Sequence, residues 1–381
     1  MATASSVNKS ASGGSDFQEN VIRFLVDNWS WFFLILLIAI ITAINPVFLT
    51  PRSISSMLVS STLILLMALG QTYVIITAGI DLSIGWTVGL ASVICATVMR
   101  DVGAAGGAPA LAITLGVLAG LGAAIVPGMV NGVLIAGLRI PPFIATIGMF
   151  GIVRGAAFLL TDGKNVVGDI PATVRDSLRA IGNGSLLYRI PGFGITWFNQ
   201  PAELTREQLR GLERLLPYPV LITAVVVVIL AFVLARTKFG RHTYAIGDNE
   251  EAARRAGINV NRHLIYIYVL ASFTAGIAGV LHVFRFTAGA PNSGEAALLD
   301  SVAAVVIGGT SLFGGEGRIS GTVVGALIIG VLETGLTILA VPSLWKFIVV
   351  GLIIIVAVLV NNVQERLEAR RVKREEHAHE G

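Results

Sequence analysis

The sequence is poor in cysteine and in charged residues. Cys95 is the only cysteine among the 381 residues, which excludes a disulfide within the chain. Its place in an apolar run predicts a buried side chain that packs as a small hydrophobe. Charged residues make up 13% of the chain, whereas a soluble domain carries roughly a quarter. Because 54% of the residues are hydrophobic, the composition predicts an integral membrane protein.

The sequence also lacks the motifs of nucleotide, metal and hydrolase sites. Gly163-Lys164 has no upstream glycine at the spacing of a phosphate loop, and the glycines of residues 314–321 miss the dinucleotide spacing. Neither metal-ligand spacing nor a serine elbow is present. We therefore expect no catalytic residue, no metal, no cofactor bound by this chain and no nucleic-acid partner.

The chain has instead a series of apolar runs long enough to cross a membrane. A helix needs about 20 residues to cross a hydrocarbon core roughly 30 Å thick. The pattern predicts an all-α polytopic bundle of about ten transmembrane helices. The predicted spans are 31–50, 54–78, 84–99, 110–138, 143–161, 217–236, 263–284, 296–313, 319–340 and 343–361. Pro127 lies in the longest run, where a kinked, a tilted and a broken helix all remain open.

The distribution of polar and basic residues divides the chain. Residues 1–30 form a polar tail, 31–361 the transmembrane domain and 362–381 a basic tail. The loop 237–262 is also basic, so this loop and the basic tail are predicted to be cytoplasmic. Ten crossings then place both termini inside and the segment 162–216 outside, although that segment mixes basic and acidic residues.

Glycine and polar residues interrupt the apolar pattern at particular places. Glycine pairs four residues apart predict close helix packing. The pairs are Gly85/Gly89, Gly116/Gly120, Gly128/Gly132, Gly151/Gly155 and Gly321/Gly325. Two polar breaks, at 79–85 and 308–317, predict two halves of about five spans each and a substrate path beside the breaks. The alternative for Asp81 is a helix cap at the membrane edge.

Four further polar residues lie inside predicted spans: Asn131, Arg154, Asp300 and Glu333. An intramembrane charge either lines a functional path, packs helices through a hydrogen bond, or extends to the interface. If Arg154 lies deep in the membrane, it needs an acidic or a carbonyl partner, and Asp81 and Asp300 are the two candidate acids.

The stretch GDNEEAARRAG, residues 247–257, predicts a short polar helix in the loop 237–262. Asp248 or Asn249 can cap it, acids occupy its first turn, arginines its last, and Gly257 ends it. So short a helix is unstable alone in water and needs a packing partner. In a chain without its own energy source, it is predicted to dock a separate ATPase.

Four motifs resemble the ribose and xylose type permeases of bacterial ABC sugar importers, within the branched-chain amino acid and sugar permease superfamily. They are AGIDLSIG (78–85), NGVLIAGLRIPPFIATIGM (131–149), FGRHTYAIGDNEEAARRAGINV (239–260) and LDSVAAVVIGGTSLFGGEGRISGT (299–322). The resemblance covers nearly the whole chain from about 31 to 361.

The resemblance implies a permease of the bacterial inner membrane that works as a homodimer or heterodimer. It implies an ABC ATPase with two nucleotide domains, which uses ATP and Mg²⁺, and an extracytoplasmic sugar-binding protein. The implied docking residues are Asp248, Asn249, Glu250, Glu251, Ala252, Ala253, Arg254, Arg255 and Gly257. The path residues, from the resemblance and from polarity, are Asp81, Ser83, Asn131, Phe143, Thr146, Asp300, Thr310 and Ser311.

The segment 162–216 looks longer than in that family. Thr205 and Gln208 predict a capping box that opens an amphipathic helix over residues 203–215. This helix lies either on the membrane surface or against the binding protein.

Together these observations predict a permease subunit for a pentose or a related neutral sugar or polyol. The first alternative is an ion-coupled secondary transporter, in which Asp81, Asp300 or Glu333 binds the coupling ion. The second is an ABC permease for a nucleoside, a sugar-like signal or a branched-chain amino acid.

Overall fold

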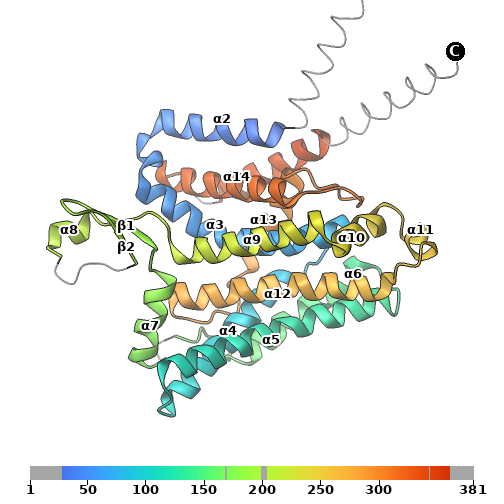
Figure 1. Ribbon diagram of the computed structural model, residues 1–381, viewed down its shortest axis with the longest axis horizontal. Helices are drawn as coiled ribbons and strands as arrows, with labels where there is room; N and C mark the ends of the chain where they lie inside the picture. The colour runs from blue at the N-terminus through green and yellow to red at the C-terminus, as the bar shows by residue number, and fades with distance from the viewer. Residues whose placement is uncertain (1–27, 168–169, 199–203, 343, 361–381) are drawn as a thin grey trace, which may run out of the picture.

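The computed structural model of the chain describes residues 28–167, 170–198, 204–342 and 344–360. Most of the two predicted tails lies outside these residues. Within them, long helices run side by side along one axis of the molecule (Figure 1). This arrangement confirms the polytopic helical membrane fold.

Each of the ten predicted spans contains one apolar helix. The helices are α2 (Trp29–Ile44), α3 (Pro51–Ile76), α4 (Ile84–Ala104), α5 (Pro109–Ala136), α6 (Pro142–Leu159), α9 (Tyr218–Arg236), α12 (Val260–Phe286), α13 (Glu295–Ile307), α14 (Ile319–Ile338) and Trp345–Val360. A 3₁₀ turn, η1 (Pro46–Leu49), joins α2 to α3. In the described part of the chain, seven helices are long and apolar enough to cross a membrane, while α2, α13 and Trp345–Val360 are shorter. α5 continues through Pro127, which excludes the broken helix.

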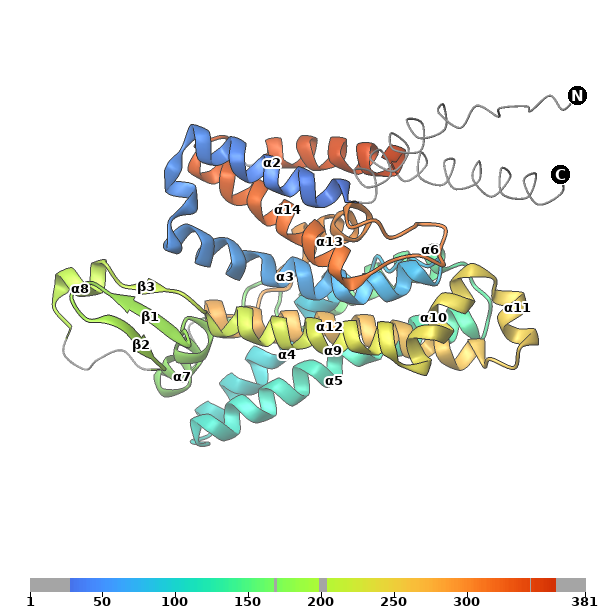
Figure 2. The ribbon, with the colours of Figure 1, turned by 45° about the horizontal axis from the view of Figure 1, so that its top comes forward.

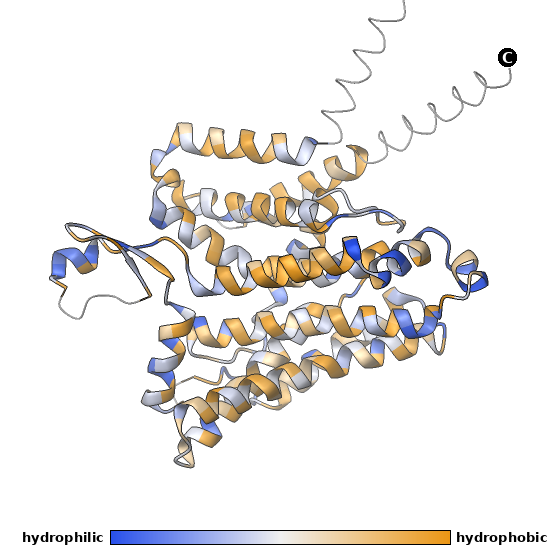
Figure 3. Cartoon of the chain, viewed as in Figure 1, coloured by the Kyte–Doolittle hydropathy of each residue, from blue (hydrophilic) through white to orange (hydrophobic). Residues whose placement is uncertain are grey.

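The bundle has two differently built ends. At the knob end lies the knob, residues 238–257, which contains α10 (Lys238–Asp248) and α11 (Glu250–Arg255). The sheet end carries α7 (Ala172–Gly182), β1 (Leu187–Ile190), β2 (Gly194–Trp197), α8 (Arg206–Arg210) and β3 (Glu213–Arg214). Figure 2 shows both ends projecting beyond the long helices, and Figure 3 shows that α8, α10 and α11 are polar whereas the long helices are mostly apolar.

The sheet end adds a small sheet to the predicted helical fold and corrects the predicted helix over 203–215. Its strands form an antiparallel sheet in the order β2-β1-β3. Thr205 and Gln208 do form the predicted capping box, but α8 ends at Arg210 and Gly211 is its C-cap. Glycine is unfavourable inside a helix, and pairing of the next residues with β1 satisfies their backbone groups.

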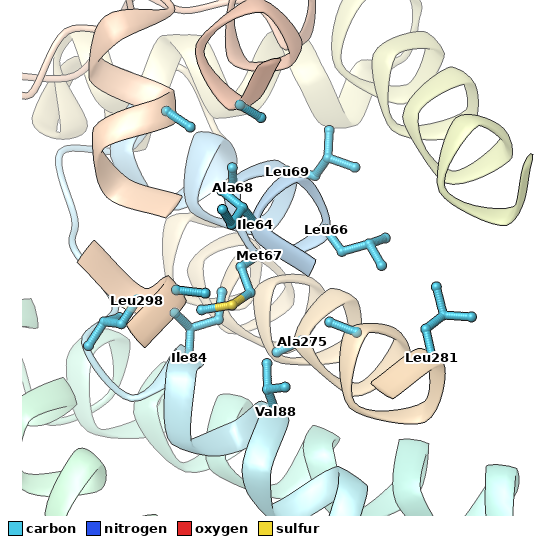
Figure 4. Packing of buried hydrophobic residues seen from close by; sticks show 14 of the residues in the cluster. Ile64, Leu66, Met67, Ala68, Leu69, Ile84, Val88, Ala275, Leu281 and Leu298 are labelled. Carbon is cyan, nitrogen blue, oxygen red and sulfur yellow. The ribbon is translucent and has the colours of Figure 1, made fainter. Parts of the chain in front are cut away.

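The hydrophobic core lies between α3, α4, α12 and α13. Met67 of α3 contacts a cluster that includes Ile84 of α4 and Leu298 of α13, as Figure 4 shows. Met67 and Ile84 are completely buried, and Cys95 is completely buried as predicted. α3 and α12 are therefore the central helices of the bundle.

Four of the five predicted glycine pairs allow helices to approach closely. Gly85 and Gly89 face residues 291–294, Gly116 and Gly120 face α4, Gly128 and Gly132 face α12, and Gly321 and Gly325 face α13. A Cβ added at Gly151 or Gly155 of α6 would meet no atom of the described residues within 4 Å. This fifth pair is therefore open on the outer surface of the protomer.

Candidate functional site

The knob carries the predicted short helix, α11. Asn249 is its N-cap and accepts a hydrogen bond from the Ala252 N–H at 2.9 Å. Glu250 and Glu251 form ion pairs with the arginines four residues later. Gly257 follows the helix with φ +84, a conformation that glycine adopts without strain. Between the two candidate caps, the structure selects Asn249.

One face of α11 is buried and the other is exposed. Ala253 is 4% exposed and packs in a cluster with Ala136 of α5, Ile246 of α10 and Leu264 of α12. This contact stabilises a helix that is too short to form alone. The exposed residues of the predicted docking set are Asp248, Asn249, Glu250, Glu251, Ala252, Arg255 and Gly257.

The knob also lies against the end of α3 and the loop 308–318, through a close approach at Gly247 and a hydrogen bond from Tyr244. The Gly315 N–H, in the loop 308–318, donates to the Ile76 carbonyl at the end of α3 (2.9 Å). A Cβ at Gly247 would lie 1.8 Å from the same carbonyl oxygen, so only glycine fits there. The Tyr244 hydroxyl donates to the Gly317 carbonyl at 2.7 Å, and burial raises the pKa of Tyr244. A displacement of the knob would therefore be transmitted to α3 and to the loop 308–318.

The first break, residues 77–83, lies between α3 and α4. The Gln71 side chain bonds both backbone groups of Asp81: its Nε2 donates to the Asp81 carbonyl at 2.6 Å, and its Oε1 accepts from the Asp81 N–H at 3.3 Å. Non-helical backbone within a membrane domain needs such partners because no bulk water is available. Gln71, which lies on α3, thus provides hydrogen-bond partners for the backbone of the break.

A buried polar cluster surrounds this break. The Ser83 hydroxyl donates to Asp81 Oδ1 at 2.6 Å and accepts from Asn131 Nδ2 at 3.0 Å. The Thr146 hydroxyl donates to a carbonyl of the break at 3.1 Å. None of these four side chains is exposed. In this conformation the cluster joins α4, α5 and α6 through hydrogen bonds.

The second break, residues 287–294, lies between α12 and α13. The Ser92 hydroxyl of α4 bonds both backbone groups of Ala290: it accepts from the N–H at 3.1 Å and donates to the carbonyl at 3.0 Å. Gly289 and Val166 exchange a further pair of backbone hydrogen bonds. The extended segment is thereby held along α4 until α13 begins.

The positions of the two breaks differ from the predicted pairing, which matched the break at 79–85 with the one at 308–317. Five spans are an odd number of crossings, so a five-span repeat reverses direction. In such a repeat the counterpart of the break 77–83 comes from the sheet end, whereas the loop 308–318 lies at the knob end beside the first break, with Gly314 next to Ala78. The segment 287–294 fits, and a Cβ at Gly85 would lie 2.8 Å from the Gly294 carbonyl oxygen. The beginnings of α4 and α13 therefore meet inside the bundle.

A polar cavity of about 330 Å³ lies in the sheet-end half of the bundle. Asp300 of α13 forms an ion pair with Lys346 at 2.7 Å, and the two side chains are 4% and 11% exposed. Glu333 of α14 lies 3.5 Å from the same ammonium group and is 43% exposed. Arg285, at the end of α12, donates to the Ser60 hydroxyl at 3.4 Å. Removal of one partner of such a buried pair leaves an uncompensated charge.

Comparison with known proteins agrees with this architecture. Residues 53–358 match the family described as branched-chain amino acid transport system / permease component. The chain belongs to this permease family.

Curated relatives extend the match over most of the permease. The ribose import permease protein RbsC of Escherichia coli K12 is 37% identical over 345 residues, which are 90% of this chain and 95% of that protein. The xylose transport system permease protein XylH of Haemophilus influenzae is 33% identical over 89% of this chain and 98% of its own length. The fructose import permease protein FrcC of Rhizobium meliloti is 38% identical over 76% and 72%. No solved structure matches the chain.

The predicted path residues of the permease occupy several places. Asp81, Ser83, Asn131 and Thr146 surround the first break, Asp300 lines the cavity, Thr310 and Ser311 lie in the loop 308–318, and Phe143 is 56% exposed on α6. The structure thus brings four of them together in one cluster.

Arg154 is exposed, so the condition for a buried partner is not met, and neither Asp81 nor Asp300 pairs with it. The Arg154 guanidinium lies over the Trp86 ring, 5.0 Å from its centroid, whereas Asp300 pairs with Lys346 and Asp81 accepts hydrogen bonds from Ser83. An aromatic face can stabilise a guanidinium without an acid.

Sequence reasoning missed Gln71, Arg285 and Lys346. Gln71 and Lys346 are polar residues inside predicted spans, which was the available signal.

Proposed function

We propose that the chain is the membrane-spanning permease subunit of an ABC importer for a pentose or a related neutral sugar or polyol. The knob carries the proposal: it presents a short, capped helix with an exposed charged face. Its Gly247 lies against the Ile76 carbonyl at the end of α3, and its Tyr244 hydroxyl donates to the loop 308–318. Three relatives are named as ribose, fructose and xylose permeases, which supports the substrate class.

In this proposal the knob end faces the cytoplasm of a bacterial inner membrane, with both termini on that side. A partner ATPase, with two nucleotide domains, binds the exposed face of residues 248–257 and supplies ATP hydrolysis with its Mg²⁺. In this proposal the chain itself supplies no ATPase site. Closure of the ATPase moves the knob, and the contact of Gly247 with the Ile76 carbonyl transmits that motion to the end of α3.

The sheet end then faces outward and receives the sugar-binding protein. Large apolar side chains are exposed on its hairpin: Phe193, Ile195, Trp197 and Phe198 are between 58% and 65% exposed. An exposed apolar patch of this kind is typical of a protein interaction site. The hairpin also projects beyond the long helices, which favours a protein partner over the membrane surface (Figure 2).

The open glycines of α6 support a dimer of permease subunits. A Cβ at Gly148, Gly151 or Gly155 would meet no described atom of this chain within 4 Å. Small residues allow two helices to approach closely in a membrane. We assign this face to a second permease copy, identical or related.

A cysteine at position 151 tests the dimer. In the Gly151→Cys variant we expect copper-catalysed oxidation of membranes to yield a disulfide-linked dimer. The native Cys95 is completely buried and serves as the unreactive background. A Gly122→Cys variant is the control, because this open glycine lies on α5. Equal cross-linking at 122 and 151 would contradict the assignment of α6.

Charge reversal in the knob tests the importer function. The double variant Glu250→Arg, Glu251→Arg should lose ATPase co-purification and sugar uptake, because both side chains are exposed and face the proposed partner. Uptake of radiolabelled ribose and xylose is measured in cells that also express the ATPase and the binding protein, at membrane levels checked by blotting.

The matched control reverses two exposed acids at the opposite end, Asp176→Arg and Glu207→Arg. This variant changes net charge equally and should keep its ATPase. If both double variants transport sugar normally, the knob is not the docking site. If uptake continues without the ATPase and stops with an ionophore, the ion-coupled transporter replaces the importer.

A further inference from the structure

The cavity near Asp300 has the chemistry of a site for a neutral hydroxylated molecule. Two carboxylates, Asp300 and Glu333, face two basic side chains, Arg285 and Lys346, so their formal charges cancel. A charged ligand gains no net attraction from such a site. A sugar hydroxyl both donates and accepts hydrogen bonds, so it can use both kinds of group.

Several of these groups keep hydrogen-bonding capacity for a ligand. Among the described residues, the Arg285 side chain donates two long hydrogen bonds, 3.4 Å each, to the Val59 carbonyl and to the Ser60 hydroxyl, and lies 5.0 Å from the Phe286 ring centroid. Glu333 is 43% exposed, and its contact with Lys346 is 3.5 Å long. Carboxylates and guanidinium groups form stronger hydrogen bonds than neutral groups do. Both side chains are therefore available at the cavity wall.

The apolar part of the lining complements the polar part. The Phe286 ring is 54% exposed at the end of α12 and lies 4.7 Å from the His282 ring, centroid to centroid. At the other side of the cavity, Leu66 and Ala297 belong to the packed core. Small-molecule sites commonly combine apolar walls with a few convergent polar groups.

The size and position of the cavity fit one small molecule. Its volume of about 330 Å³ is at the lower end of the roughly 300–1,000 Å³ usual for small-ligand sites. It is lined by the sheet-end parts of α9 and α12, at Pro219 and Phe286, and reaches Leu66 near the middle of α3. Leu66 of this lining belongs to the same packed core as Met67 and Leu298 (Figure 4).

We propose that this cavity, within a single permease subunit, binds one monosaccharide between its release by the binding protein and its passage towards the knob end. Asp300 and Lys346 form the polar floor, and Arg285 and Glu333 bond the sugar hydroxyls. This inference rests on the proposed sugar-import function.

Protection of an introduced cysteine tests the site. Ala296 is exposed and lines the cavity, whereas Ala180 is exposed on α7 outside it. Ala296→Cys and Ala180→Cys variants in nanodiscs are labelled with a hydrophilic maleimide, with D-ribose, D-xylose, D-fructose or D-allose present. Betaine at the same osmolarity is the control solute, and Cys95 is completely buried.

We expect at least one sugar to slow labelling at 296 and to leave labelling at 180 unchanged. At a sugar concentration ten times Kd, labelling at 296 should be about tenfold slower, because occupancy follows mass action. Adding Glu333→Gln should raise the sugar concentration needed for protection, at an unchanged labelling rate without sugar.

Two results would overturn the site: unchanged labelling at 296 with every sugar, or equal slowing at 296 and 180. Uptake by the unaltered chain with its ATPase and binding protein is measured in parallel. If uptake occurs without protection, the cavity assignment fails and the importer function stands. If none of the four sugars is taken up, the proposed substrate class fails as well.

Discussion

In the two breaks, different side chains form the hydrogen bonds that the buried, non-helical backbone needs. At 77–83, Gln71 of the preceding helix bonds both the N–H and the carbonyl of Asp81. At 287–294, Ser92 of a neighbouring helix bonds both groups of Ala290. In each case one side chain replaces the partners that a helix would have supplied.

The difference between the breaks lies in their surroundings. The first is enclosed by a polar cluster that includes Ser83 and Asn131, whereas the second is supported by backbone bonds from Val166. The first break should therefore depend on its side chains more strongly than the second. Three substitutions examine this comparison, from the largest expected effect to the smallest.

Gly89→Val should destabilise the permease most, because it displaces the whole second break. A Cβ at position 89 would lie 1.8 Å from the Pro291 carbonyl oxygen. Overpacking of a tight core costs about 1–3 kcal/mol and occasionally more, and a direct clash with a backbone carbonyl that cannot move aside places this variant above that range. Thermal unfolding in detergent, followed by circular dichroism, measures the loss.

The control for this variant is Gly122→Val, where a Cβ would meet nothing within 4 Å. It should unfold close to the unaltered protein. Equal destabilisation of both variants would show that the contact between α4 and the second break is not responsible.

Gln71→Leu should have the next largest effect. It leaves the buried N–H and carbonyl of Asp81 without their partner, and each unsatisfied group costs about 1–3 kcal/mol. The same unfolding assay measures the change, with hydrogen exchange at residues 77–83 as a local readout. Normal stability together with unchanged exchange would mean that Gln71 does not hold the first break.

Ser92→Ala should cost less, about 1 kcal/mol. The backbone bonds between Gly289 and Val166 remain and continue to hold the segment. Ser177→Ala on α7 is the control, since its hydroxyl bonds only the carbonyl four residues earlier, on the exposed face. A larger loss for Ser92→Ala than for Gln71→Leu would reverse the order of the two breaks.

Hydrophobic patterning was enough to predict the helical bundle, because every predicted span contains a helix. Capping chemistry located α11, since Asn249 and Gly257 act locally along the chain. The Thr205–Gln208 capping box was also correct in detail. The features that could be predicted from the sequence were thus local ones: periodicity, caps and breaks.

Contacts between distant segments could not be predicted from such local patterns. Asp300 and Lys346 are 46 positions apart, and the pairing depends on how α13 and the last helix pack. The break 287–294 went unnoticed because alanine, proline and glycine there give no charge signal. The strands were not predicted for a similar reason, since β3 has two residues and is defined by its pairing with β1.

The approach of Gly247 to Ile76 has a consequence for the choice of ATPase subunit in the proposed importer. The direction in which α11 projects is set by backbone contact, without any of its exposed side chains. Those side chains can change in sequence while the direction of the helix is kept. A hybrid importer could therefore be built by transplanting only the exposed residues of another permease's knob, so that a foreign ATPase drives this bundle.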